Sequence, residues 1–258
     1  GLKAVTITFA FTGVIAVILY LIFMKNPEEI GEKALGWEHA QKLAQAEGNL
    51  NSTDYGIEFS DVIKSFSFYM VLSSCLLWAL AMILFPYFAT VLQSGGVSDV
   101  VSARFQSFGQ ICLAVFCIFI GTVTSKFGIK TYIFFAFGSC LAGVAALGVW
   151  CYTGTSGLLY IAAIFLGSGY AVGTTYGPMI TTKLFGTKAY ERIIPIVFGM
   201  RCIGLGAGIW IVPAIAESTQ NWAYGCWAAL IMLAAGAALG YLAILFSPMK
   251  KTKHTLTD

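Results

Sequence analysis

The sequence predicts an all-α membrane protein with seven transmembrane helices. Of its 258 residues, 58% are hydrophobic and only 10% are charged, whereas a soluble domain carries about 25% charged residues. The mean hydropathy is +0.81, and a soluble domain with so few charges could not cover its surface with polar side chains. The apolar residues form long continuous runs, unlike the alternating strands of a membrane β-barrel. A soluble, disordered or coiled-coil chain is therefore excluded.

The apolar runs locate the individual helices, because a membrane span needs about 20 mostly apolar residues. A charge-free stretch from Thr131 to Thr182 is too long for one helix, and the run Thr-Gly-Thr-Ser-Gly at 153–157 divides it in two. The last run ends at Pro248, which precedes a basic tail. The predicted spans are 4–24, 66–92, 105–125, 131–152, 157–182, 193–216 and 222–247.

The basic side chains predict the orientation. With the N-terminus outside, twelve of the fifteen Lys and Arg residues fall in the inner segments 25–65, 126–130, 183–192 and 248–258. Short loops rich in Lys and Arg remain on the cytoplasmic side. We therefore expect an integral protein of the bacterial plasma membrane with its C-terminus in the cytoplasm. The net charge of +3 is too small to indicate a nucleic-acid partner.

The chemistry available in the spans excludes several functions. All seven cysteines lie in apolar stretches without a C-x-x-C pair, and His39 and His254 lie in polar segments. The sequence therefore predicts no metal site, no cofactor and no enzyme. Neither G-x-G-x-x-G nor a glycine run followed by G-K-[ST] occurs, so nothing supports ATP-driven transport.

The segment between the third and fourth spans carries a recognisable pattern. Residues 121–130 read Gly-Thr-Val-Thr-Ser-Lys-Phe-Gly-Ile-Lys. This run resembles the second-half copy of the loop motif G-x-x-x-D-R-x-G-R-R/K of the major facilitator superfamily. Ser125 stands where that motif has an acid, so part of its charge network is missing while the tight turn is kept. The residues assigned to the motif are Gly121, Ser125, Lys126, Gly128 and Lys130.

Three further runs resemble the same superfamily in the expected order. Residues 26–31 resemble the P-E-x-x-G run after the sixth helix, and residues 59–66 resemble the approach to the seventh. Residues 185–190, leading to Gly-Met-Arg at 199–201, resemble the run into the eleventh helix of the oxalate/formate antiporter and monocarboxylate porter branches.

The resemblance implies a domain organisation of one linker-side helix plus a six-helix bundle. Residues 1–24 would be the last helix of an absent N-terminal bundle, and 25–65 the cytoplasmic central loop. Residues 66–248 would form the C-terminal six-helix transmembrane bundle, and 249–258 a cytoplasmic basic tail. We therefore expect this chain to be part of a longer transporter.

Arg201 is the charged residue nearest the middle of a predicted span. It follows Arg192 by nine residues, which is roughly 13 Å along a helix, inside a hydrocarbon core about 30 Å thick. A charge at this depth costs at least about 2.5–3.5 kcal/mol, so Arg201 should face a cavity or a partner. One interpretation is a substrate site in which the guanidinium binds a carboxylate in a bidentate pose. The other is a structural arginine bonded to backbone carbonyls or to an acid in the missing half of the transporter.

The resemblance favours the first interpretation, because oxalate/formate antiporter-like proteins carry a substrate-binding base on helix eleven, and Arg201 falls at the matching place. They also carry a base on helix eight, whereas span 105–125 has none and offers Gln106 and Gln110. That departure favours a monocarboxylate or another anion over a dicarboxylate. Tyr69, Tyr170 and Thr174 are further candidate substrate-binding residues, with hydrogen bonding between helices or an interfacial position as their alternative role.

Small residues recur at helical spacing and predict close packing of the helices. The alternative functional role is to let the helices slide or bend during the transport cycle. The positions are Gly169, Gly173, Gly177, Pro178, Gly204 and Gly208.

The leading hypothesis is a secondary transporter that moves a small organic anion by alternating access, as a uniporter, symporter or antiporter. Its partners would be the anionic substrate, membrane lipid and an N-terminal bundle, with a coupling ion where transport is ion-driven. The alternative is a seven-helix receptor or a non-transporting membrane scaffold.

Overall fold

The structure is a computed structural model that describes residues 55–248, together with Phe11, Val14, Ile15 and Ile18. Those four residues are helical and exposed, and the rest of the predicted span 4–24 lies outside the described residues. The same holds for most of the central loop, for the tail from residue 249, and for the side chains of 121–130.

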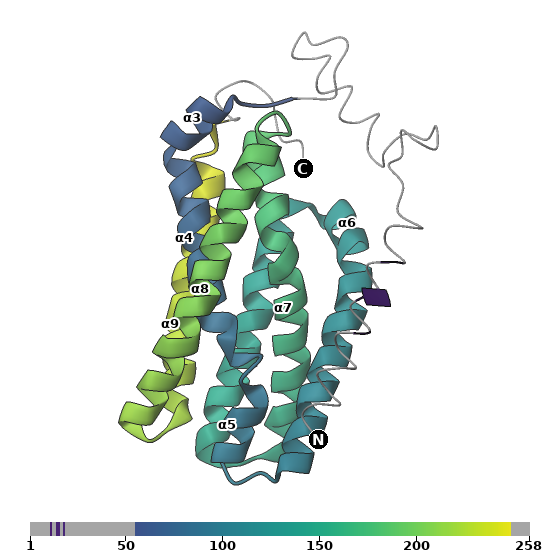
Figure 1. Cartoon of the computed structure of the whole chain (residues 1–258), viewed down its shortest axis with the longest axis vertical. Coiled ribbons are helices and arrows are strands. Elements are labelled where there is room, and N and C mark those ends of the chain that lie inside the picture. The colour runs from purple at the N-terminus through teal and green to yellow at the C-terminus, as the bar shows by residue number, and fades with distance from the viewer. Residues whose placement is uncertain (1–10, 12–13, 16–17, 19–54, 249–258) are drawn as a thin grey trace. The chain divides into compact units, whose positions relative to one another are not determined.

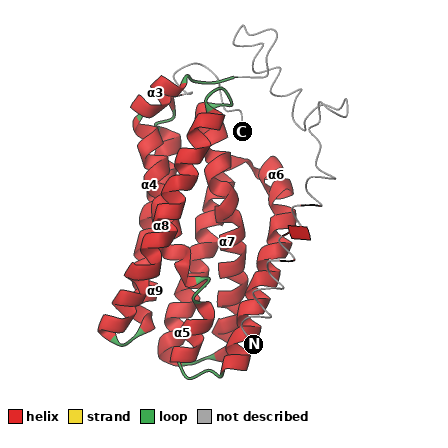
Figure 2. Ribbon diagram, in the orientation of Figure 1, coloured by secondary structure: helices red, strands yellow, loops and turns green. Residues whose placement is uncertain are grey.

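Within the described residues the chain is helical, and its one β-bridge, between Gly56 and Gly186, is isolated. Figure 2 shows helices joined by short loops. The elements are α3 (Phe59–Lys64), α4 (Phe66–Ala81), the 3₁₀ turn η2 (Met82–Leu84), α5 (Phe88–Ser94), α6 (Asp99–Thr153), α7 (Ser156–Phe185), α8 (Tyr190–Thr219) and α9 (Trp222–Leu245).

Six stretches in these helices are long and apolar enough to cross a membrane, which confirms the all-α membrane class predicted from the sequence. They are Phe66–Leu84, Asp99–Ile120, Thr131–Thr153, Ser156–Phe185, Tyr190–Thr219 and Trp222–Leu245. Each overlaps one of the six predicted spans between residues 66 and 247.

The first of these spans is shorter than predicted because proline interrupts it. Ser65 caps the start of α4 by accepting the N–H of Phe68. Near the other end the helix tightens into η2, and Pro86 follows, which lacks the N–H that a continuous helix needs. The chain resumes as α5, where Gln106 accepts the backbone N–H of Ala89 at 3.3 Å. The predicted span 66–92 is therefore two helical pieces joined by a turn.

Although α6 is assigned as one helix, its two membrane stretches run in opposite directions along α7. The rings of Phe105 and Tyr160 are 4.9 Å apart, and a Cβ on Gly167 would meet Cys112, so the first stretch runs parallel to α7. The Tyr132 hydroxyl donates to the Val172 carbonyl at 2.6 Å.

The second stretch then proceeds toward the start of α7. A Cβ on Gly143 would lie 2.7 Å from the nitrogen of Leu166, beside the Gly167 position that the first stretch contacts. In a straight helix, residues 109 and 143 would be about 50 Å apart. Both nevertheless contact the same part of α7, because a Cβ on Gly109 would lie 3.5 Å from the Ala163 carbonyl oxygen. The chain therefore reverses between residues 120 and 131.

Close approach between backbones holds α4 against α8, which lie side by side in Figure 1. A Cβ on Gly204 would lie 2.6 Å from the Leu76 carbonyl oxygen, and one on Gly208 would lie 2.8 Å from that of Leu80. Both distances are too short for a side chain, so these positions require glycine. The order of the contacts makes α4 and α8 parallel.

The segment before α3 is tied to the connection between α7 and α8. The Ile57 N–H donates to the Phe185 carbonyl at 3.0 Å. Glu58 and Lys188 form an ion pair at 2.6 Å, and the Arg192 guanidinium lies 5.9 Å from the centroid of the Phe59 ring. These contacts fix the end of the bundle that the charge distribution predicts to be cytoplasmic.

Candidate substrate site

Trp78 of α4 is the central side chain of the bundle and is only 1% exposed. Its indole Nε1 donates to the Cys140 sulfur of α6 at 3.4 Å. The Tyr170 ring of α7 lies 5.6 Å away, centroid to centroid, and Gly173 of the same helix lies directly against the indole, where a Cβ would overlap it. Trp78 thus fixes the spacing of three helices around one rigid ring.

Arg201 of α8 lies on the same ring. Its guanidinium carbon is 5.2 Å from the centroid of the Trp78 ring, which is a cation–π geometry. The side chain is half-buried, and its buried Nε has no hydrogen-bond partner among the described residues. An unpartnered polar atom of a cation inside a membrane bundle is energetically costly, so a further acceptor at this position would be stabilising.

A small cavity of about 10 Å³ lies beside Arg201. That volume accommodates about one water molecule and is too small for a carboxylate ligand. Thr174 lies at this cavity, although its hydroxyl already donates to the Ala171 carbonyl at 2.6 Å. The lining residues are Cys75, Trp78, Gly173, Thr174, Tyr176, Gly177, Pro178, Val197, Phe198 and Arg201.

The structure brings some of the predicted site residues together and leaves others apart. Arg201 and Thr174 line one cavity, and Tyr170 adjoins it by packing on Trp78 and on Phe85. Tyr69 is 52% exposed and its ring packs on Phe68.

The two glutamines of the third predicted span are also not among the residues that line the Arg201 cavity. The side chain of Gln106 accepts the backbone N–H of Ala89 in α5, and the side chain of Gln110 is exposed. The side chains of the loop motif at 121–130 lie outside the described part of the structure.

Tyr176 is close to the site but belongs to the core. Its hydroxyl shares a 2.9 Å hydrogen bond with Ser74, and Ser74 donates to the Gly236 carbonyl at 2.7 Å. Both side chains are at most 1% exposed. A Cβ on Gly240 would lie 3.1 Å from the Ser74 oxygen, so glycines of α9 make room for this network. It joins α4, α7 and α9.

Trp78 and Cys75 are the site residues that the sequence analysis missed. Both lie in a predicted span, in which only Tyr69 was proposed to bind substrate. A usable signal was present for Trp78, because tryptophan prefers the membrane interfaces and this one lies in the interior of an apolar run. Cys75 gave no comparable signal, since a thiol in an apolar stretch is an ordinary packing residue.

Replacing Gln106 by alanine is expected to destabilise the bundle by about 1–3 kcal/mol, because the Ala89 N–H would lose its acceptor beside the proline break. Thermal unfolding of the purified protein measures this effect. The exposed neighbour Gln110 provides the matched control, since its replacement by alanine should leave the unfolding temperature unchanged. Equal shifts for both substitutions would contradict the assignment.

Among the described residues no group of three or more His, Cys, Asp or Glu side chains is placed to hold a metal ion. A search of the curated proteins finds no match to this chain. Residues 1–209 match the Major Facilitator Superfamily, whose members are membrane transporters. Because the match covers most of the chain, and because the described residues form apolar membrane helices, this chain belongs to the Major Facilitator Superfamily.

Proposed function

We propose that this protein is a secondary transporter of a small organic anion, most simply a monocarboxylate, and that Arg201 binds the carboxylate group. The observation that carries the proposal is the environment of Arg201: a cation held over the Trp78 ring, with a buried Nε that lacks a partner among the described residues. A carboxylate oxygen is the acceptor that such a group prefers.

The acidic residues of the same helix are too distant to serve as that partner. Glu191 and Glu217 of α8 are ten and sixteen residues from Arg201, or roughly 15 and 24 Å along the helix axis. The ion pair identified among the described residues joins Glu58 and Lys188, at the end of the bundle. The positive charge of Arg201 is therefore available to a ligand.

A single cation favours a monocarboxylate over a dicarboxylate. The stretch Asp99–Ile120 contains one basic residue, Arg104, which lies near its start and is exposed. A dicarboxylate bound at Arg201 would leave its second carboxylate without a cation in the interior of that stretch. Burial of that second charge would cost several kcal/mol.

We further propose that the substrate site lies between this bundle and a second one. The cavity beside Arg201 is too small to hold a carboxylate substrate by itself. In the 18-residue apolar part of Asp99–Ile120, 6% of the residues are buried, and in that of Tyr190–Thr219, 22% are buried. Both helices therefore offer uncovered faces. In this proposal residues 66–248 are the C-terminal bundle, and residues 1–24 contribute the last helix of the other.

Alternating access supplies the transport mechanism in this proposal, with the inner face set by the basic loops. Pro178 lies inside α7 at the Arg201 cavity, and Pro195 and Pro213 lie inside α8. Each proline removes one backbone hydrogen bond and allows a helix to bend. Bending of α7 and α8 would open the cavity to one side of the membrane at a time.

Uptake into proteoliposomes tests the proposed substrate class. The protein is expected to accumulate a labelled short monocarboxylate, with competition by other monocarboxylates and much weaker competition by the corresponding neutral amides. Imposed proton or sodium gradients, or a preloaded counter-anion, then distinguish symport from antiport. Equal competition by the amide and the acid would contradict a site built on the charge of Arg201.

A further inference from the structure

We propose that Cys151 and Cys226 are a redox-active pair that forms a reversible disulfide by exchange with small-molecule disulfides. The two residues come from different helices: Cys151 lies in the last turn of α6, and Cys226 in the second turn of α9. Both lie at the end of the bundle that the basic residues predict to be outside, where oxidising conditions permit disulfides.

The geometry places the two thiols together. The side chains of Cys151 and Cys226 lie within interaction range of each other. One turn earlier in α6, a Cβ on Gly148 would lie 3.3 Å from the Cβ of Cys226, so the backbones of α6 and α9 approach closely at this level. Thiols within one helical turn of such an approach need little backbone movement to form a bond.

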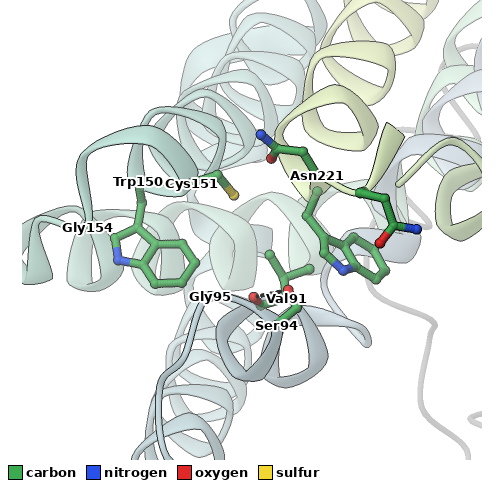
Figure 3. A pocket seen from close by; sticks show the side chains of 9 residues that line it. Val91, Ser94, Gly95, Trp150, Cys151, Gly154 and Asn221 are labelled. Atoms are coloured by element: carbon green, nitrogen blue, oxygen red, sulfur yellow. Dashed lines mark hydrogen bonds between the residues drawn. The ribbon is translucent and has the colours of Figure 1, made fainter. Parts of the chain in front are cut away.

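A pocket gives small molecules access to Cys151, one thiol of this pair. It has a volume of about 230 Å³ and lies where α5, α6 and α8 end and α9 begins. Figure 3 shows the Cys151 sulfur directed into the space between Trp150 and Asn221. Cys226 is fully buried and does not line the pocket. The residues that line the pocket are Val91, Ser94, Gly95, Trp150, Cys151, Gly154, Gln220, Asn221 and Trp222.

The difference in access assigns the two roles. The thiolate of Cys151 attacks an external disulfide RSSR, which forms a mixed disulfide on Cys151 and releases one RS⁻. The thiolate of Cys226 then attacks the Cys151 sulfur and displaces the second RS⁻. The protein loses two protons and two electrons, and RSSR is reduced to two RSH after protonation. An external thiol reverses the sequence.

The other cysteines have no such arrangement in the described structure. Cys75 and Cys140 are buried against Trp78, which donates a hydrogen bond to the Cys140 sulfur. Cys117 and Cys202 are exposed and Cys112 is half-buried. These three would react singly with a disulfide reagent, so their replacement by alanine gives a background in which Cys151 is the accessible thiol.

Reaction of that purified triple variant with dithiodipyridine tests the proposal. We expect two equivalents of thiopyridone to be released per protein, with no pyridyl group retained. Intact mass should fall by two hydrogens, peptide mapping should find residues 151 and 226 cross-linked, and dithiothreitol should restore the starting mass. A pyridyl group that remains on Cys151, or a cross-link to another cysteine, would overturn the proposal.

Single replacements separate the roles of the two thiols. In the same background, Cys226→Ala should release one equivalent and keep a stable mixed disulfide on Cys151, whereas Cys151→Ala should prevent release altogether. Release of two equivalents from Cys226→Ala would sink the pairing. Cys226→Ser is the second variant if alanine impairs folding, with monodisperse elution and an unchanged unfolding temperature as the folding check. Reagent added to either side of sealed proteoliposomes locates the accessible face.

Discussion

Replacing Arg201 by glutamine is expected to reduce carboxylate uptake by about 30-fold or more while the protein still folds and reaches the membrane. Removing one member of a buried charge pair costs about 2–5 kcal/mol, and about 1.4 kcal/mol corresponds to a factor of ten. Glutamine keeps a polar side chain of similar reach but removes the charge and the planar fork of donors. Initial rates of labelled monocarboxylate uptake into proteoliposomes measure the loss.

Two further variants show whether the effect belongs to the site. Arg201→Lys keeps the charge and removes the bidentate geometry, so an intermediate loss is expected. Arg192→Gln removes a charge from the same helix near the predicted inner end, where Arg192 packs on Phe59, and should preserve most of the uptake. Full activity of Arg201→Gln would refute substrate binding by Arg201 and favour the structural interpretation.

Replacing Gly173 by alanine is expected to destabilise the bundle by about 3 kcal/mol or more, because overpacking a tight core forces rings or helices apart. The added Cβ would overlap the indole of Trp78, whose ring is held by Cys140, by Tyr170 and by the guanidinium of Arg201. Detergent-based thermal unfolding, together with the yield of monodisperse protein, measures the effect. Uptake should fall with stability, since the overlap displaces the ring on which Arg201 lies.

A matched glycine and a compensating substitution make this prediction specific. Gly157 lies in the same helix and has open space at its Cβ position, so Gly157→Ala should be neutral. The Trp78 atoms that an added Cβ at residue 173 would overlap include the indole nitrogen. Phenylalanine at position 78 has a single ring and lacks that nitrogen, so it would relieve the overlap. The double variant Gly173→Ala, Trp78→Phe should therefore regain stability relative to Gly173→Ala. Absence of that coupling in the double-mutant cycle would show that Trp78 is not the obstruction.

Much of the fold could be predicted because hydrophobicity along a membrane chain is a strong local signal. Runs of apolar residues gave both ends of four of the six described spans to within three residues, and the glycine-rich break at 153–157 separated the fourth span from the fifth. The ends of the other two, predicted at 66–92 and 105–125, differ by up to eight residues. Local breaks were harder to place. Pro86 divides the predicted span 66–92 into α4 and α5, whereas Pro178, Pro195 and Pro213 stay inside continuous helices. Packing against neighbouring helices decides between these outcomes.

The candidate site could be predicted only in part. A charge in the middle of a span is costly wherever the helix packs, so Arg201 stood out without any structure. The partners of a polar side chain depend on which helices become neighbours. Gln106 and Arg201 are both polar groups in apolar spans, yet Gln106 is used by the backbone N–H of Ala89 while the Nε of Arg201 is unpartnered among the described residues.

The sequence by itself determined that this chain is a helical membrane protein with a cation inside its bilayer region. Both conclusions follow from the free energy of transferring each residue between water and lipid, which depends mainly on residue type and position along the chain. The tertiary structure decided that Arg201 lies over Trp78, that Gly173 makes room for the indole, and that α6 and α9 bring Cys151 close to Cys226 at the end of the bundle. These contacts join residues from 75 to 123 positions apart, and only the packing of one helix against another sets such distances.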